Sequence, residues 1–281
     1  MKIILSRKGF DTTSGGCPSP ILPDGTLLSL PIPDEEDLKY SDLQYKGFSY
    51  DSILTGLNPR VVYSGCHLDP DIREGVRIVP AENWRPAFGQ TGSALGILRN
   101  AQVTIGDLFL FFGIFRQTEY DENGVLRFAN EKGAVHLIHS YLQIGEILDT
   151  PEKIKKCSWH PHADFERYRS DRNALYLASE KLSLCPSLPG CGVLSYREDR
   201  VLTMEGKTPA TWREYKFLMP DHIIGNRKNS ARCGGLYYQG QWQELILKPD
   251  KEAEEWAVKS IMLRIGVREH VSPYQGSHIH E

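Results

Sequence analysis

One apolar run near the middle of the chain constrains the fold more than any other feature of the sequence. It covers residues 108–115 and reads Leu-Phe-Leu-Phe-Phe-Gly-Ile-Phe. The run has the length of a strand, and its almost wholly apolar character is typical of a strand that is covered on both faces. We therefore expect a sheet at the centre of the protein.

Other patterns extend this sheet. Residues 135–147 form a second long strand pattern with a break or bulge at Gly145, and the Asn-Gly pair within 120–125 predicts a hairpin turn. Because strands do not alternate with helices, we expect an α+β fold with a curved or barrel-like mixed β-sheet, a few peripheral helices and long ordered loops. Further strands are expected at 2–5, 76–79, 192–196, 214–218 and 242–247, and helices within 34–58, at 173–184, and from Asp250 to a stop at Gly266.

The size and composition of the chain exclude several classes of protein. Of its 281 residues, 40% are hydrophobic and 10% aromatic, which argues against disorder and fits a single domain over 1–268 with a flexible C-terminal tail over 269–281. No apolar run approaches the roughly 20 residues of a membrane helix. The apolar residues at the N-terminus meet Ser6-Arg7-Lys8 at once, too early for a signal peptide. We expect a cytoplasmic protein without a membrane partner.

The six cysteines do not form a recognisable site. They are scattered through the chain, and none belongs to a Cys-x-x-Cys pair. Cys185 and Cys191 enclose a loop that could hold a metal or a disulfide. Without a secretion signal, however, reduced packing residues are the more common role, and no disulfide is expected.

The first strand leads into a loop that suits an anion. Arg7 and Lys8 stand at its end, before a segment rich in glycine and hydroxyl side chains. Glycine lets backbone N–H groups approach an anion, arginine grips phosphate or carboxylate in a fork, and lysine adds a point charge. The alternative is a turn with solvated cations, since the ending of a P-loop is absent. The candidate anion-binding residues are Arg7, Lys8, Asp11, Ser14, Gly15, Gly16 and Ser19.

His160, His162 and Asp164 alternate along the chain. On an extended backbone, such residues face the same side. Two histidines and one carboxylate can form a face that leaves positions open on Fe(II), or they can form a catalytic zinc set. The alternative is a loop with exposed or hydrogen-bonded histidines.

A second set of candidate ligands lies earlier in the chain. His67, Asp69 and Asp71 also alternate, and an Asp-Pro turn is the alternative for this segment. If it converges with the 160–164 segment, five or more ligands would meet around one or more iron or zinc ions. His139 is a further candidate, because it is in phase with a polar row that continues to Gln143 and that lines a pocket or faces solvent.

The second half of the chain has a cationic stretch around 223–232. Its arginine and lysine side chains, interleaved with asparagine and serine, suit contacts with phosphates, and nearby aromatic residues could stack on bases. Exposed cationic loops are the alternative. The candidate nucleic-acid contacts are Arg197, Arg213, Arg227, Lys228 and Arg232.

Several of these motifs resemble one family, the nucleotide-modification-associated domain of the third type. The motifs are the opening residues 2–11, the segments 14–25 and 29–33, the Gly-Asp-Leu strand at 106–113, and Trp159-His160-Pro161-His162. The similarity extends to about residue 265 and is most specific in the opening motif. The resemblance implies an association with base modification in DNA, often near phage or mobile-element genes, but it supplies no set of catalytic residues. The Gly-Asp-Leu strand alone also resembles small barrel domains of the PUA type, which bind modified bases.

These observations lead to one hypothesis and two alternatives. The hypothesis is a metal-dependent enzyme or accessory enzyme in nucleic-acid base modification. It would bind a phosphate- or carboxylate-bearing substrate, act on a nucleotide or DNA, and work with other base-modification enzymes. Its divalent metal would be Fe(II) rather than Zn(II), because oxidation of a base is a common first step in hypermodification; with Zn(II) it would be a hydrolase. The alternatives are a non-catalytic reader of modified bases or nucleotides, and a metal-dependent oxygenase that acts on a small molecule or peptide.

Overall fold

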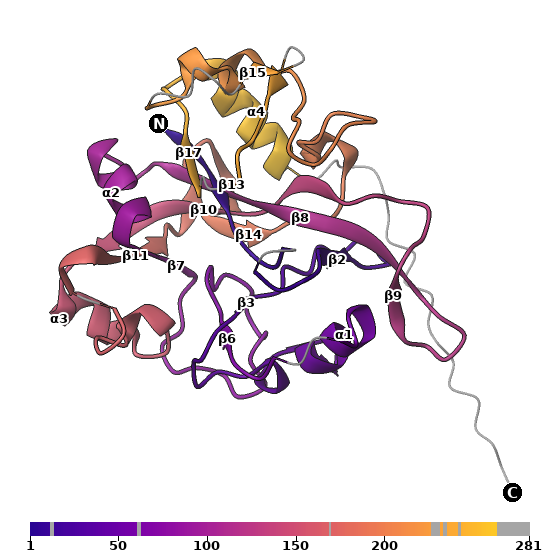
Figure 1. Cartoon of the computed structure of the whole chain (residues 1–281). Coiled ribbons are helices and arrows are strands. Elements are labelled where there is room, and N and C mark those ends of the chain that lie inside the picture. The colour runs from indigo at the N-terminus through magenta and orange to yellow at the C-terminus, as the bar shows by residue number, and fades with distance from the viewer. Residues whose placement is uncertain are drawn as a thin grey trace, which may run out of the picture.

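A curved sheet of nine strands runs through the middle of the protein (Figure 1). The structure is a computed structural model that describes residues 1–11, 14–60, 63–168, 170–225, 231–232, 235–240 and 243–262. Six strands follow one another across the sheet in the order β17 (Glu244–Ile246), β1 (Ile3–Arg7), β8 (Leu108–Tyr120), β10 (Val135–Leu148), β11 (Asn173–Ala178) and β7 (Ala87–Thr91). Three more pair alongside, namely β14 (Cys191–Val193) with β10, and β2 (Ser19–Ile21) and β9 (Leu126–Phe128) with β8. The pairs of β8 with β1 and with β2 are parallel, and the other pairs in this sheet are antiparallel.

Strand β8 is buried on both faces, as its sequence predicts. Phe109 packs on one face in a cluster that includes side chains of α2 (Gly92–Asn100). Leu110 and Phe112 pack on the other face in a cluster that includes side chains of α4 (Lys251–Ile261). All three side chains are fully buried. The sheet is therefore the middle layer between two separate cores.

A third core lies in the lobe below the sheet in Figure 1. This lobe contains α1 (Tyr50–Leu57) and the short pair of β3 (Ile32–Pro33) with β6 (Cys66–His67). Its core is built around buried Tyr40, whose hydroxyl donates a hydrogen bond to the Pro31 carbonyl at 2.6 Å. The remaining short elements are β4 (Gln44–Tyr45), β5 (Phe48–Ser49), α3 (Pro151–Ile154), β12 (Lys181–Leu182), β13 (Cys185–Pro189), β15 (Ala231–Arg232) and β16 (Gly235–Leu236).

The expected α+β class with a curved sheet is confirmed, as are its strongest elements. Strand β10 has a register shift between Ile144 and Glu146, which is the predicted bulge at Gly145. The predicted hairpin joins β8 to β9, with Gly124 at a φ of 73°. Asp250 caps α4 by accepting hydrogen bonds from two backbone N–H groups, and the helix ends at Ile261, while Gly266 and the 269–281 segment lie outside the described residues.

Three local predictions are wrong. The helix expected at 173–184 is strand β11, because Leu175 and Tyr176 project to opposite faces of the sheet and both are buried between β10 and β7. The strand expected at 214–218 is a 3-10 turn over Lys216–Leu218. The strand expected at 76–79 is reduced to a single bridge at Arg77, because Val79 is exposed. Helix α2 was not anticipated, since two glycines weaken its helical pattern.

Two further expectations concern membrane helices and disulfides. Among the described helices, none is long and apolar enough to cross a membrane. The five cysteines in the described part carry free thiols, and Cys233 lies outside it.

His136 on β10 is a titratable group inside the core. Its Nδ1 accepts a hydrogen bond from Trp212 Nε1 at 3.0 Å. Burial, helped by the charge of Arg7, lowers the pKa of His136 from 6.5 to about 4. The folded protein therefore keeps this ring neutral at a pH where the unfolded chain protonates it.

Acidification should destabilise the protein through this residue. Between pH 6.5 and 4 the unfolded state binds a proton at His136 that the folded state does not, so the free energy of unfolding should fall by up to about 3 kcal/mol. His136→Asn keeps an acceptor for Trp212 but does not titrate, and its pH dependence should be shallower by about that amount. Urea unfolding at several pH values measures this, with exposed His222→Asn as the control. An unchanged slope in His136→Asn would contradict the prediction.

Candidate metal centre

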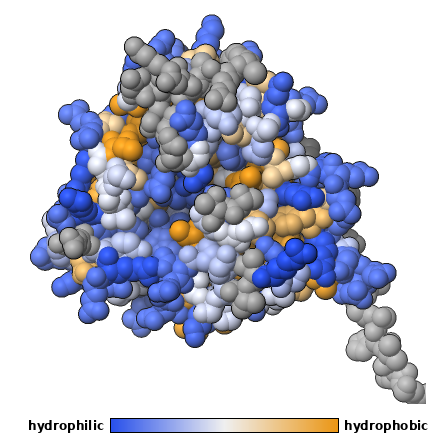
Figure 2. Space-filling model, viewed as in Figure 1, coloured by the Kyte–Doolittle hydropathy of each residue, from blue (hydrophilic) through white to orange (hydrophobic). Residues whose placement is uncertain are grey.

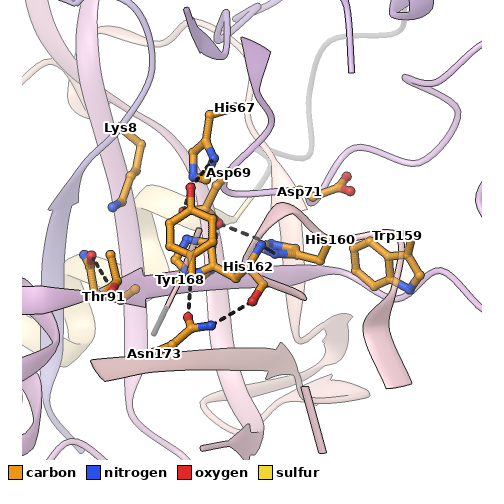
Figure 3. A network of polar contacts seen from close by, with 12 residues as sticks. Lys8, His67, Asp69, Asp71, Thr91, Trp159, His160, His162, Tyr168 and Asn173 are labelled. Atoms are coloured by element: carbon orange, nitrogen blue, oxygen red, sulfur yellow. Dashed lines mark hydrogen bonds and ion pairs between the residues drawn. The ribbon is translucent and has the colours of Figure 1, made fainter. Parts of the chain in front are cut away.

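Segments far apart in the sequence meet beside the sheet (Figure 3). Strand β6 ends at His67, the chain continues through Asp69 to β7, and a 3-10 turn over Pro161–Ala163 carries His162. One donor atom from each of His67, Asp69 and His162 lies within 4.8 Å of the other two. We call these three residues the HDH group. The segments 67–71 and 160–164, whose convergence could not be read from the sequence, are therefore neighbours in space.

His67 is oriented by a carboxylate on its outer side. Its Nδ1 lies 2.6 Å from Glu36 Oε1, and an imidazole N–H at this distance donates to the carboxylate. The Tyr168 hydroxyl lies 3.2 Å from both of these atoms. With its proton on Nδ1, His67 keeps a lone pair on Nε2, which lies 3.9 Å from Asp69 Oδ2.

His162 is oriented in the same manner by an amide. Its Nδ1 lies 2.7 Å from Asn173 Oδ1, while Asn173 Nδ2 donates to the His162 carbonyl at 2.7 Å, which fixes the orientation of the amide. His162 therefore donates from Nδ1 and keeps a lone pair on Nε2. Burial lowers the pKa of His162 to about 3, so the ring is neutral. The Tyr168 ring stacks on it with centroids 4.4 Å apart.

Asp69 is held as an anion in a nearly buried position. Its side chain is 4% exposed, and Oδ1 accepts a hydrogen bond from the Gly89 backbone N–H at 2.7 Å. Burial alone would raise the pKa of Asp69, but the contact with His160 and the proximity of His162 and Lys8 outweigh it and hold the pKa well below its usual range. Its other oxygen, Oδ2, faces His67 and lies 3.9 Å from Nε2 of that ring.

His160 lies beside Asp69 but is not part of the HDH group. Its Nδ1 accepts the His162 backbone N–H at 3.2 Å, so Nε2 carries a proton. Nε2 lies 3.4 Å from Asp69 Oδ1. In this arrangement His160 has no free lone pair for a metal, unlike His67 and His162.

Gly89 on β7 fits where a larger residue does not. Its N–H donates to Asp69, and a Cβ atom at this position would lie only 2.5 Å from His162 Cδ2. The backbone of β7 thus forms a wall against which both a carboxylate and an imidazole pack.

The other candidate ligands lie outside the HDH group. The 3-10 turn replaces the extended backbone on which alternation would have aligned Asp164, whose Oδ1 instead accepts backbone N–H groups at 2.9 and 3.2 Å. Asp71 pairs with Arg77 at 2.5 Å. His139 sits at a register shift in β10, so it is out of phase with the polar row expected there, and its Nδ1 lies 2.8 Å from Ser140 Oγ.

The predicted anion site is divided between the two sides of β1. Arg7 lies over the Tyr238 ring, 6.0 Å from its centroid, and 3.7 Å from Asp11. Lys8 lies 3.8 Å from Glu244 and is close enough to Asp69 to lower its pKa. Only Lys8 therefore faces the HDH group (Figure 3).

The glycine and hydroxyl residues of the same prediction make contacts within their own loop. The Ser14 backbone N–H donates to Asp11, and Ser19 Oγ accepts the Leu30 N–H at 3.2 Å. A Cβ at Gly15 would overlap the Phe10 ring, and the Gly16 carbonyl accepts a hydrogen bond from an asparagine side chain.

Two of the predicted nucleic-acid contacts are engaged in ion pairs. Arg197 pairs with Asp199, and Arg213 pairs with Glu198. Arg232 lies in β15, and Arg227 and Lys228 lie outside the described residues.

Sequence reasoning did not identify Glu36, Tyr168, Asn173 or Gly89 as parts of the site. Glu36 and Tyr168 reach the histidines from loops whose folding the sequence pattern does not reveal. Asn173 gives one weak signal, because it is a buried polar residue at the start of an otherwise apolar strand pattern.

A groove of about 670 Å³ lies next to the HDH group. Trp159 and His160 line it, together with Glu36, which also contacts His67. Trp159 Nε1 is buried without a hydrogen-bond partner among the described residues. Hydrophilic side chains gather over α3 and the turns that follow it, at the lower left of Figure 2. The volume is within the range of small-molecule sites.

Comparison with known proteins finds one family. The model of the family described as nucleotide modification associated domain 3 matches residues 2–255. No curated protein and no solved structure matches the chain.

Substitution of Gly89 should disturb the HDH group and the fold together. In Gly89→Ala the new methyl group meets the His162 ring, and overpacking of this kind costs about 1–3 kcal/mol of unfolding free energy. Gly96→Ala is the matched control, because Gly96 is in α2 with open space around its Cβ position and should gain up to about 1 kcal/mol. Urea unfolding measures the free energy of unfolding of both variants and of the wild type. Equal stability of the two variants would contradict the packing argument.

Proposed function

Because the chain belongs to the nucleotide modification associated domain 3 family, we propose that it is a metal-dependent enzyme, or accessory enzyme, of nucleic-acid base modification. Its divalent ion would be held by His67, Asp69 and His162. The observation that carries the proposal is the meeting of two imidazoles and one carboxylate in a largely buried site. The family supports the nucleotide substrate, and the residue chemistry supports the metal.

The outer hydrogen bonds of the HDH group are those that metal ligands need. A ligating histidine must be neutral, and its other ring nitrogen usually donates to a carboxylate or carbonyl that fixes the tautomer. Glu36 provides this acceptor for His67, and Asn173 provides it for His162. His67 directs Nε2 towards Asp69, 3.9 Å from Oδ2, and Nε2 of His162 is the ring nitrogen that its contact with Asn173 leaves for an ion.

The ligand set favours Fe(II) over Zn(II). Two histidines and one carboxylate on one face are typical of Fe(II) sites with open positions, although zinc also accepts this set. Bound Fe(II) would supply oxygen activation for oxidation of a base, whereas Zn(II) would supply an activated water for hydrolysis.

The remaining residues would position a nucleotide. Trp159 offers an aromatic surface for a base in the groove beside His160, while Tyr168 covers His162. Asn173 and Glu36 would hold the two imidazoles still during turnover. We propose a nucleotide or DNA as the substrate and other base-modification enzymes as the partners that act before or after it.

A non-catalytic reader of modified bases is the second candidate. The Trp159 groove would serve such a module equally well, since stacking on a tryptophan needs no metal. The HDH group favours the enzyme, because base stacking alone would not call for a set of metal ligands beside the groove.

Metal content tests the proposal directly. Protein purified anaerobically without a chelating tag should contain about one equivalent of metal by mass spectrometry, with iron in excess over zinc. His67→Ala/His162→Ala should contain none, because it loses two of three ligands. His222→Ala, at an exposed histidine, should keep the full content. Stoichiometric metal in the double variant would refute the assignment.

The hydrogen bond between His162 and Asn173 gives a finer prediction. Asn173→Ala removes the acceptor that orients His162 but no ligand, so metal affinity should fall about 10- to 100-fold rather than vanish. Competition with a chelator measures the change. Wild-type affinity in Asn173→Ala would mean that His162 does not bind the ion through Nε2.

A further inference from the structure

We infer that Lys8 forms a subsite for an oxyanion, the carboxylate or phosphate group of a ligand that reaches the HDH group. The inference rests on the proposed function, because it takes the HDH group next to Lys8 to be the metal site that the ligand reaches. It specifies where the charged end of the ligand lies and which residue recognises it.

The Lys8 side chain is mostly buried, and its ammonium has no hydrogen-bond acceptor among the residues that the structure describes. The side chain is 12% exposed, and Nζ lies over the face of the Phe88 ring, 4.4 Å from the centroid. An ammonium carries three N–H donors, so all three are left for solvent or a ligand. A ligand oxyanion would supply the acceptors.

Glu244 provides charge near Lys8 but no hydrogen bond. Its Oε1 lies 3.8 Å from Nζ, beyond hydrogen-bond distance, and already accepts from Ser6 Oγ at 3.0 Å and Gln90 Nε2 at 2.7 Å. Its Oε2 is buried without a partner among the described residues. Burial also raises the pKa of Glu244, although the charge of Lys8 lowers it, so the negative charge of this side chain is disfavoured.

The charges around the HDH group orient the ligand. Lys8 and Trp159 lie on opposite sides of the group in Figure 3. On the Trp159 side, carboxylates outnumber cations along the groove, which repels an anion. The carboxylates are Glu35, Glu36, Asp37, Asp42 and Asp164, and the cations are Arg77, Lys155 and Arg167. An oxyanion is therefore favoured at Lys8, with the uncharged part of the ligand directed towards Trp159.

Calorimetric titration of the full chain tests the subsite. The probes are oxalate for a carboxylate source and thymidine 5′-monophosphate for a phosphate source, each added to metal-free and Mn(II)-loaded protein. At least one probe should bind, and Lys8→Met should weaken it at least about tenfold, the usual effect of losing a charged hydrogen bond. Exposed Lys46→Met is the matched control and should bind as the wild type does.

A second readout uses the wild-type chain, so it does not depend on the folding of a variant. Saturating probe should slow acetylation of Lys8 at least about threefold by peptide mass spectrometry, while Lys46 should react at an unchanged rate. The inference is overturned if neither probe binds, if Lys8→Met binds as the wild type does, or if Lys8 is not protected.

The two proposals fail separately. Probe binding in a protein that holds no metal would keep the Lys8 subsite and remove the metal-dependent function. Stoichiometric metal without probe binding would do the opposite.

Discussion

A carboxylate can be buried in a protein only if polar contacts replace the water that it loses, and Asp69 obtains them from distant parts of the chain. The Gly89 N–H comes from the edge strand of the sheet, and the His160 ring, 3.4 Å from Oδ1, comes from the loop after α3. Because Asp69 itself follows β6 in the lobe, its carboxylate joins the lobe to the sheet. Its other oxygen lies 3.9 Å from His67 Nε2, so the packing of the lobe against the sheet also brings the HDH group together.

The electrostatic environment of this group is asymmetric. Lys8 stands on one side, with its ammonium making no hydrogen bond to the described residues, whereas a groove with more carboxylates than cations opens near the other. Arg7, the next residue along β1, is directed to a different surface and is balanced by Asp11. Two adjacent cations that look equivalent in the sequence thus have separate environments, because successive side chains of a strand alternate between its faces.

Local patterns predicted the central strands, the hairpin and α4, because burial on both faces, Asn-Gly turns and an Asp cap are signals contained within a few residues. They failed at 173–184, where apolar residues spaced for either a helix or a strand are decided by pairing with β10 and β7. For the site, His67, Asp69 and His162 were among the candidates, but their grouping was not predictable. It depends on a 3-10 turn after His160 and on loops that bring Glu36 and Tyr168 across the molecule.

The position of β1 in the sheet has a consequence for biosynthesis. Among the described strands β1 comes earliest in the sequence, yet its neighbours are β8 and β17, which follow roughly 100 and 240 residues later. Contacts so remote in sequence form slowly, and an unpaired apolar strand is prone to associate with other chains. During synthesis the Ile-Ile-Leu edge of β1 therefore stays open to association with other chains until β17 has been made.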